Sequence, residues 1–192
     1  MRKAIIVFVL VLGLSGCGYN GIQQQDETVK SAWSEVLNQY QRRSDLVPQL
    51  VATVKGYAAH EKEVLLQVTN ARSKAGSVQL SASQLPNEQQ LQQFSQAQGE
   101  LTSALGRLNV VLERYPNLKA NEAFTNLQTQ LEGNENRITH ARRQYIEAVR
   151  QFNTTIRQFP VNLTAKLFSY KPVPNFSVGN AEAISHPPKV EF

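Results

Sequence analysis

The sequence is poor in the residues on which disulfide scaffolds, metal centres and β-sheets depend. Its 192 residues include one cysteine, Cys17, so no disulfide can form within the chain. One cysteine and three histidines are also too few to make a zinc cage a reasonable expectation. Aromatic residues make up 8% of the chain, and no stretch of useful length alternates apolar with polar residues as a half-buried strand does. A protein built from long helices with polar faces fits this composition better than a β-sandwich.

Charge of one sign is not concentrated anywhere in the sequence. The chain has 20 Lys and Arg against 15 Asp and Glu, which gives a net charge of +5. Without Arg2 and Lys3 the balance is 18 against 15, or +3. No run of basic residues with interleaved aromatics appears, so we expect no nucleic-acid partner.

The amino terminus has the features of a secretory signal. Arg2 and Lys3 precede an unbroken apolar run, Ala4–Leu14, which is eleven residues long and falls short of the ~20 residues that span a bilayer. The run ends in "LSGC", which resembles the bacterial lipobox. That resemblance implies cleavage before Cys17, a diacylglycerol thioether on its sulfur and an acyl chain such as palmitate on its new amino group. Two or three acyl chains would form an effectively permanent membrane anchor.

An uncleaved anchor is the alternative, because extending the run through Gly18 almost reaches spanning length. Both interpretations place the following domain on the non-cytoplasmic side of the membrane of a bacterial cell envelope. Gly18 is not the aspartate that often retains lipoproteins in the inner membrane, which favours the outer membrane in a cell with two. The chain therefore divides into a signal peptide (1–16), a lipid-anchored linker (17–25), a helical bundle (26–160) and a Pro-rich extended tail (161–192).

Within residues 26–75 the apolar residues recur in steps of three and four, which predicts a buried helical stripe. Pro48 interrupts this stripe. A proline inside a helix costs ~3 kcal/mol, whereas one in the first turn removes an N–H that has no partner. Because Ser44 or Asp45 could cap a new helix, we expect a break or a strong bend at Ser44–Pro48.

Two further long helices follow a connection at Gly76–Pro86. The first begins with a capping box formed by Asn87 and Gln90 and has a regular apolar seam, as in a coiled coil. The second begins at an Asn121 N-cap and is expected to run to Phe159. Short connections force antiparallel neighbours. The predicted fold is an all-α, antiparallel, up-and-down bundle of the four-helix type.

The tail is expected to be extended, with one short turn around residues 163–168. We expect it to lie along the bundle through Phe168, Tyr170 and Phe176, and to be disordered at its end.

Two long segments, Gln41–Arg72 and Tyr115–Pro160, resemble the signature of the bacterial LemA family. The resemblance implies a mostly antiparallel four-helix bundle behind a membrane segment or lipoprotein anchor. It also implies no established catalytic residue or cofactor, and some relatives occur in magnetosome membranes. The chain departs from the family at Tyr145-Ile146, where members usually have "YN", while Phe152-Asn153 keeps the asparagine.

Arg42, Arg43 and Asp45 lie at the expected break. As a site they would bind an anionic small molecule or a glycan through guanidinium forks. In a purely structural role, Asp45 would cap a helix, and an arginine would bond to Asp45 or to the last carbonyls of the preceding helix. Both interpretations remain open from the sequence.

Other candidates are weaker. His60-Glu61 begins a zinc-protease-like stretch, but the second histidine is replaced by Val64, and we expect His60 to be a half-exposed helix residue. Glu132 and Glu135 lie one turn apart without the histidines of a di-metal site, so no metal is expected. Glu135 could instead pair with Arg42 or Arg72 across the core.

A last candidate is a basic stripe. Arg143, Arg150 and Arg157 are spaced by seven on the last long helix, with Glu147 among them. They form either a contact for anionic lipid or an acidic partner, or a solvated face. We expect a non-enzymatic envelope scaffold or adaptor with no cofactor and with a protein partner or a second copy of itself. The alternative is a binding module for a small anionic ligand or glycan near Arg42, Arg43 and Asp45.

Overall fold

A computed structural model describes the backbone of residues 2–176 and the side chains of residues 18–176. Within that range the chain is all-α and contains no strand, as predicted. The helices are α1 (Arg2–Tyr57), α2 (Lys62–Ser77), α3 (Glu88–Leu112), α4 (Pro116–Lys119), α5 (Glu122–Thr155) and α6 (Val161–Leu167). No helix among the described residues has an apolar stretch long enough to cross a bilayer.

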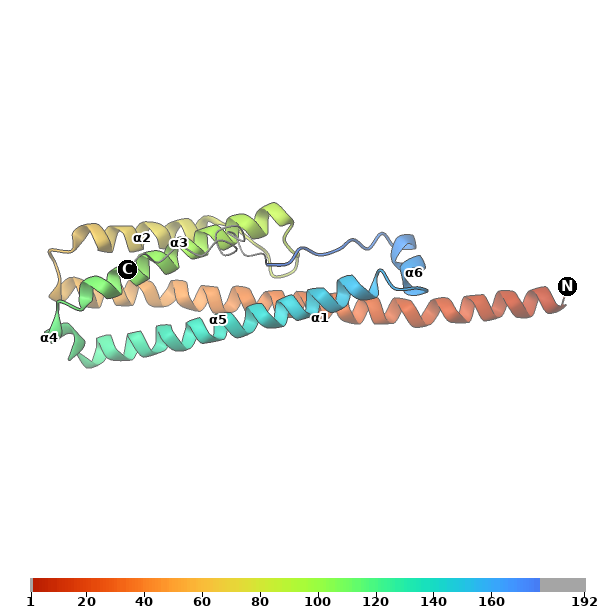
Figure 1. The fold of residues 1–192 in the computed structure, drawn as a ribbon, viewed down its shortest axis with the longest axis horizontal. Coiled ribbons are helices and arrows are strands. Elements are labelled where there is room, and N and C mark those ends of the chain that lie inside the picture. Colours follow the sequence, from red (N-terminus) through yellow and green to blue (C-terminus); the bar gives the residue numbers. More distant parts are fainter. Residues whose placement is uncertain (1, 177–192) are drawn as a thin grey trace, which may run out of the picture.

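Four long helices form an up-and-down bundle (Figure 1). α1 and α5 lie side by side and antiparallel over most of the length of the bundle, while α2 and α3 form a second antiparallel pair beside α1. α4 connects α3 to α5 at one end. α6 packs against α1 at the other end, from which the N-terminal part of α1 extends beyond the bundle.

The predicted helix starts of α3 and α5 are confirmed. Asn87 accepts a hydrogen bond from the backbone N–H of Gln90 at 2.8 Å, and the Gln90 side chain accepts one from the backbone of Asn87 at 2.9 Å. The Asn121 side chain accepts from the N–H of Phe124 at 3.0 Å. These bonds satisfy N–H groups that have no partner inside the helix.

Of the break or strong bend expected at Pro48, the break is wrong, because α1 continues through Pro48 to Tyr57 and the chain reverses between α1 and α2 instead. Pro48 has no N–H to donate to the carbonyl of Ser44, its partner in a regular helix. Arg72 of α2 supplies the missing donor: its Nε lies 2.8 Å from the Ser44 carbonyl oxygen. Asp45 therefore caps no helix; it is exposed and accepts from the Gln41 side chain at 2.8 Å.

The apolar core consists of two clusters that follow one another along the bundle. The first contains the aromatic side chains Trp33, Phe94 and Tyr145 together with aliphatic residues of α1 and α5. The Trp33 ring lies 5.7 Å from Phe94 and 5.3 Å from Tyr145, centroid to centroid. Leucines and valines dominate the second cluster, which is centred on α2, α3 and the later part of α1. Such burial supplies most of the free energy of folding.

Both ends of the bundle differ from the predicted boundaries. α5 ends at Thr155 rather than Phe159, and the short turn expected around residues 163–168 is the helix α6. The backbone of residues 17–25, the predicted linker, is part of α1, and Ile22 is fully buried.

The C-terminal segment lies along the bundle as expected at Tyr170 and Phe176, whereas Phe168 is 54% exposed. Tyr170 packs against Phe152 and Phe176 packs against Tyr145, with ring centroids 6.2 and 5.4 Å apart. The expectation of disorder concerns residues 177–192, which lie outside the described residues.

The Arg72–Ser44 contact yields a prediction about Pro48. Arg72→Ala should lower the free energy of unfolding by about 1–2 kcal/mol, because the Ser44 carbonyl loses its donor. In a Pro48→Ala background the new N–H can bond to Ser44, so the same substitution should cost less than half as much. Urea unfolding of the four chains gives this coupling as a double-mutant cycle.

Lys74→Ala is the matched control on the same helix, since Lys74 makes an exposed ion pair with Glu100. It should change stability by a few tenths of a kcal/mol in both backgrounds. An equal cost of Arg72→Ala with and without Pro48 would show that the arginine does not compensate for the proline.

Candidate functional site

Arg43 is the most unusual side chain of the bundle, because it is charged and only 1% exposed. Its Nη1 donates to Glu135 Oε1 at 2.7 Å and to Thr102 Oγ1 at 2.9 Å. Its Nη2 donates to the side-chain and main-chain oxygens of Gln98 at 2.6 and 3.2 Å. The guanidinium also lies 5.0 Å from the centroid of the Tyr40 ring. One residue of α1 thus contacts α3 and α5 at once.

Asn134 extends this arrangement on α5. It is fully buried, and its Nδ2 donates to the main-chain and side-chain oxygens of Gln39 at 3.1 and 3.2 Å. With the Arg72–Ser44 bond, all four long helices are joined at one level. We call the following residues the central polar layer: Gln39, Arg43, Ser44, Arg72, Gln98, Thr102, Asn134 and Glu135.

The structure separates the residues that sequence reasoning had grouped at the helix break. Arg42 is exposed whereas Arg43 is buried, so the predicted contact of Arg43 with a surface ligand or lipid is wrong. Glu135 was expected to pair with Arg42 or Arg72, but its partner is Arg43. Without a break in α1, the ligand site predicted around Arg42, Arg43 and Asp45 loses its structural basis. A contact at Arg42 stays a prediction.

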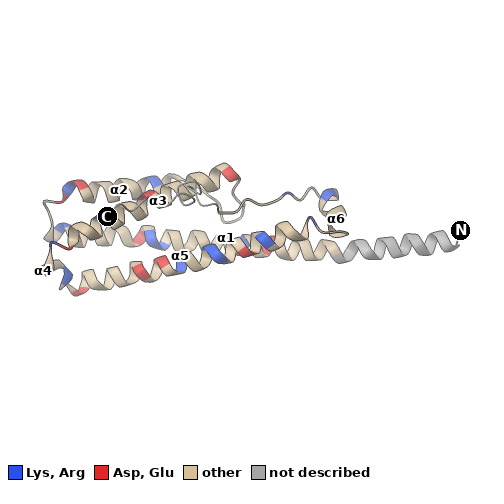
Figure 2. Ribbon diagram, in the orientation of Figure 1, with Lys and Arg blue, Asp and Glu red and all other residues tan. Residues whose placement is uncertain are grey.

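The basic stripe on α5 is only partly regular. Arg143 and Arg150 are exposed on α5, but Arg157 lies beyond the end of the helix. Arg150 donates to both carboxylate oxygens of Glu147, from Nε at 2.8 Å and from Nη2 at 2.6 Å. The pKa of Glu147 is lowered to about 2 by its hydrogen bonds from Arg150 and Gln151. In Figure 2, residues of both charge signs are interspersed along the bundle.

Arg143 lines a polar groove between α1 and α5, on a face of these helices that is open to solvent. Carboxylates and amides of both helices form its walls. The lining includes Gln24, Glu27, Glu35, His140, Arg143, Gln144 and Glu147. Its mixed charge suits a polar protein surface better than a membrane, and a role for Arg143, Arg150 or Arg157 in lipid binding stays a prediction.

The C-terminal segment is held along the bundle by side chains of α5 that recognise its backbone. Asn153 bonds to both the carbonyl and the N–H of Val173, each at 2.8 Å. The Tyr145 hydroxyl donates to the carbonyl of Pro174 at 3.0 Å, and burial raises the pKa of Tyr145, which keeps that donor protonated. This use of Asn153 was missed, although the Phe152-Asn153 pair was noted in the sequence.

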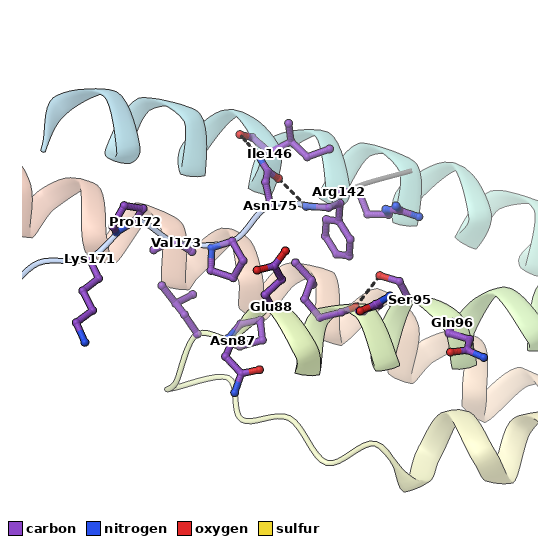
Figure 3. A pocket seen from close by; sticks show the side chains of 16 residues that line it. Asn87, Glu88, Ser95, Gln96, Arg142, Ile146, Lys171, Pro172, Val173 and Asn175 are labelled. Carbon is purple, nitrogen blue, oxygen red and sulfur yellow. Dashed lines mark hydrogen bonds between the residues drawn. The ribbon is translucent and has the colours of Figure 1, made fainter. Parts of the chain in front are cut away.

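Just beyond these contacts the segment forms one wall of a groove of about 1300 Å³, and the other walls are the N-terminal part of α3 and α5 (Figure 3). Asn175 donates to the carbonyl of Ile146 at 3.2 Å, and Arg142 lies 4.4 Å from the centroid of the Phe176 ring. Residues 171–176, which are extended and bonded to α5, therefore form a wall of the groove themselves.

The remaining sequence candidates do not assemble into a site. His60 is exposed in the turn between α1 and α2, so the expectation of a half-exposed helix residue is wrong. Glu61 accepts from the Tyr115 hydroxyl at 2.8 Å and from Arg114 at 3.0 Å, which ties that turn to the end of α3. Among the described residues no group of three or more His, Cys, Asp or Glu could hold a metal ion. Cys17 belongs to α1, and its side chain lies outside the described part.

The described chain is thus an all-α protein in which four long antiparallel helices are joined by one polar layer, whose residues Arg43, Gln98 and Asn134 are buried. The LemA family model matches residues 32–192, and the chain belongs to the LemA family, as its sequence motifs indicated.

Individual relatives are identical to the chain at about a quarter of the aligned positions. The chain is 25% identical over 184 residues to "Protein LemA" of Metamycoplasma hominis, an alignment that covers 94% of the chain and 80% of that protein. It is 24% identical to "Magnetosome protein MamQ 2" of Paramagnetospirillum magneticum, with 88% of the chain and 66% of that protein covered. "Magnetosome protein MamQ" of Magnetospirillum gryphiswaldense is 23% identical, with 90% and 68% covered.

The central polar layer predicts that two adjacent arginines differ sharply in their effect on stability. Arg43→Ala should lower the free energy of unfolding by about 1–3 kcal/mol, because it leaves the buried side chain of Gln98 without its partner. Arg42→Ala, the matched control, should change it by no more than about 0.5 kcal/mol. Thermal and urea unfolding of the two variants measure the difference, and similar losses would contradict a special role of Arg43.

Proposed function

We propose that the protein is a non-enzymatic lipoprotein of the bacterial cell envelope, anchored by lipid on Cys17, whose bundle is a scaffold or adaptor. The observation that carries this proposal is the continuity of α1, which runs from Arg2 to Tyr57. Ile22, only a few residues after Cys17, is already fully buried in the bundle. A lipid on Cys17 would therefore be connected to the bundle by the helix α1 rather than by a flexible linker. Such a connection suits a protein that holds a partner at a fixed position near a membrane.

The comparisons support a place at a membrane. The family resemblance implies a membrane segment or lipoprotein anchor before the bundle, and several relatives are named as magnetosome proteins. In the proposed arrangement the domain lies on the non-cytoplasmic side, with the outer membrane favoured in a cell with two membranes by Gly18. A single-pass protein with an uncleaved segment is the alternative that the experiment below distinguishes.

The use of the buried polar groups supports a role other than catalysis. Arg43, Asn134 and Glu135 bond to neighbouring helices rather than converging on a cavity. The groove between α1 and α5 offers carboxylates, amides and Arg143 to a protein surface. We propose that the partner, another envelope protein or a second copy of this chain, binds on this face.

The anchor is tested by mass spectrometry and membrane fractionation of the full chain. The mature protein should begin at an acylated Cys17, and Cys17→Ala should lose both the lipid and the processing. Ser15→Ala keeps a small residue before Gly16 and should be processed as before. If Cys17→Ala is still cleaved and membrane-bound, the lipoprotein proposal is wrong, and a wild-type chain that retains Met1 supports the single-pass alternative.

The binding face is tested by site-specific photo-cross-linking in cells. A photoreactive residue in place of Gln144, in the α1–α5 groove, should give a discrete adduct, whether with an envelope protein or with a second copy. The same residue in place of Gln67, exposed on α2, should give none. Equal adducts at both sites, or none at either, would contradict a partner on this face.

A further inference from the structure

We propose that the end of the bundle formed by Phe159, Leu163, Leu167 and Phe168 inserts directly into the lipid surface, as a second membrane contact besides the N-terminal anchor. We call these four residues the α6 patch. The proposal rests on the proposed function in one respect, namely that the N-terminal segment holds the chain at a membrane. It adds a site, a partner of defined chemistry and an orientation of the bundle.

These four residues place several exposed large apolar side chains within one short segment of the described chain. Phe159 is 80% exposed, Leu163 59%, Leu167 78% and Phe168 54%. The other exposed large apolar residues, such as Leu66 and Val110, are scattered over the bundle. Single exposed apolar residues need no explanation, whereas several within one short segment mark a surface that meets an apolar partner.

The patch is fixed beside the point where α1 leaves the bundle. A Cβ atom on Gly18 would lie 3.5 Å from Thr164 Oγ1 and 3.6 Å from Val161 Cγ2, so α6 packs closely on the residue that follows Cys17. The Tyr19 ring lies 4.8 Å from the Phe168 ring, centroid to centroid. The side-chain amide of Gln23 donates hydrogen bonds to the hydroxyls of Tyr19 and Tyr170, which joins α1 to the segment that follows α6.

The surroundings of the patch match the chemistry of a lipid surface. Arg157, Lys166 and Lys171 are exposed in the same stretch of the chain, and the sequence has no Asp or Glu between Glu147 and Glu182. A short helix with apolar residues toward the acyl chains and basic residues at headgroup level is typical of interfacial binding, strongest on anionic lipids. Ala165, on the opposite side of α6, is 3% exposed and packs on the bundle, so Leu163 and Leu167 are left to face outward.

The position along the chain favours lipid over a protein partner. The apolar run Ala4–Leu14 lies in the same helix as Gly18, and both the lipidated and the uncleaved form place the bilayer next to residue 17. Because α6 packs on residue 18 and the Phe168 ring packs on Tyr19, the patch must then lie close to the level of the headgroups. Figure 1 shows α6 at the end of the bundle from which the N-terminal part of α1 extends.

A fluorescent probe on the full chain tests this contact. Leu167→Cys, labelled with nitrobenzoxadiazole, is reconstituted in phosphatidylethanolamine and phosphatidylglycerol vesicles with and without a doxyl-labelled lipid. An interfacial helix lies ~5–10 Å into the boundary, so the doxyl group should remove more than about half of the emission. Val110→Cys is the matched control, because Val110 is 73% exposed but lies on α3 near the opposite end of the bundle. Its emission should not change.

The outcomes separate this proposal from the lipoprotein proposal. An acylated Cys17 carries no free thiol, so the mass of the labelled chain reports the anchor in the same sample. An acylated protein whose residue-167 probe is not quenched overturns the α6 patch alone. A chain that carries the label on both residue 17 and residue 167 has an unacylated Cys17, which overturns the lipoprotein proposal but not the α6 patch. The emission of the residue-167 probe is then measured in the Cys17→Ala background. A probe shielded from water but not quenched by doxyl lipid shows that protein covers the patch, which also overturns the proposal.

Discussion

The pairing of Arg43 inside the bundle is the constraint on which the other features of the fold depend. A guanidinium does not lose its charge on burial, so its donors must meet acceptors or the folded state is destabilised by several kcal/mol. Here the acceptors come from two other helices: Gln98 and Thr102 on α3 and Glu135 on α5. The side chain of Glu135 remains 44% exposed, which keeps part of the pair hydrated. These contacts align α1 with α3 and α5 at this level, although the Nε of Arg43 and the Oδ1 of Asn134 have no partner among the described residues.

This constraint explains why the apolar core is divided in two. Helices that pack through repeating leucines and valines can shift along one another by a turn at modest cost, whereas a polar layer has one satisfied alignment. The aromatic cluster around Trp33 lies on one side of the layer, and the aliphatic cluster around Leu101 lies on the other. Arg72 connects α2 to the same level by bonding to the carbonyl that Pro48 leaves free.

The sequence predicted the features that depend on neighbours along the chain and failed where the partner is distant. The Asn87–Gln90 capping box is a local signal, and it is confirmed. Pro48 was expected to break α1 because local rules cannot include a donor 28 residues from the carbonyl it serves. The spacing of apolar residues along the sequence contained a clearer signal for the buried members of the central polar layer. Arg43, Gln98 and Asn134 each occupy an apolar position of a stripe with steps of three and four, as in Tyr40, Arg43, Val47. Periodicity shows that such a residue is buried, but not which helix satisfies it.

The same continuity of α1 gives the proposed scaffold a defined geometry. At 1.5 Å per residue, the helix from Gly18 to Tyr57 is about 60 Å long. A bundle anchored at residue 17 would place its α4 end at roughly that distance from the anchor. The central polar layer would prevent the helices from sliding under load, and the α6 patch would limit tilting at the membrane. A partner bound between α1 and α5 would then be held at a fixed distance from the membrane, because the membrane and that face are connected only through a continuous helix and packed contacts.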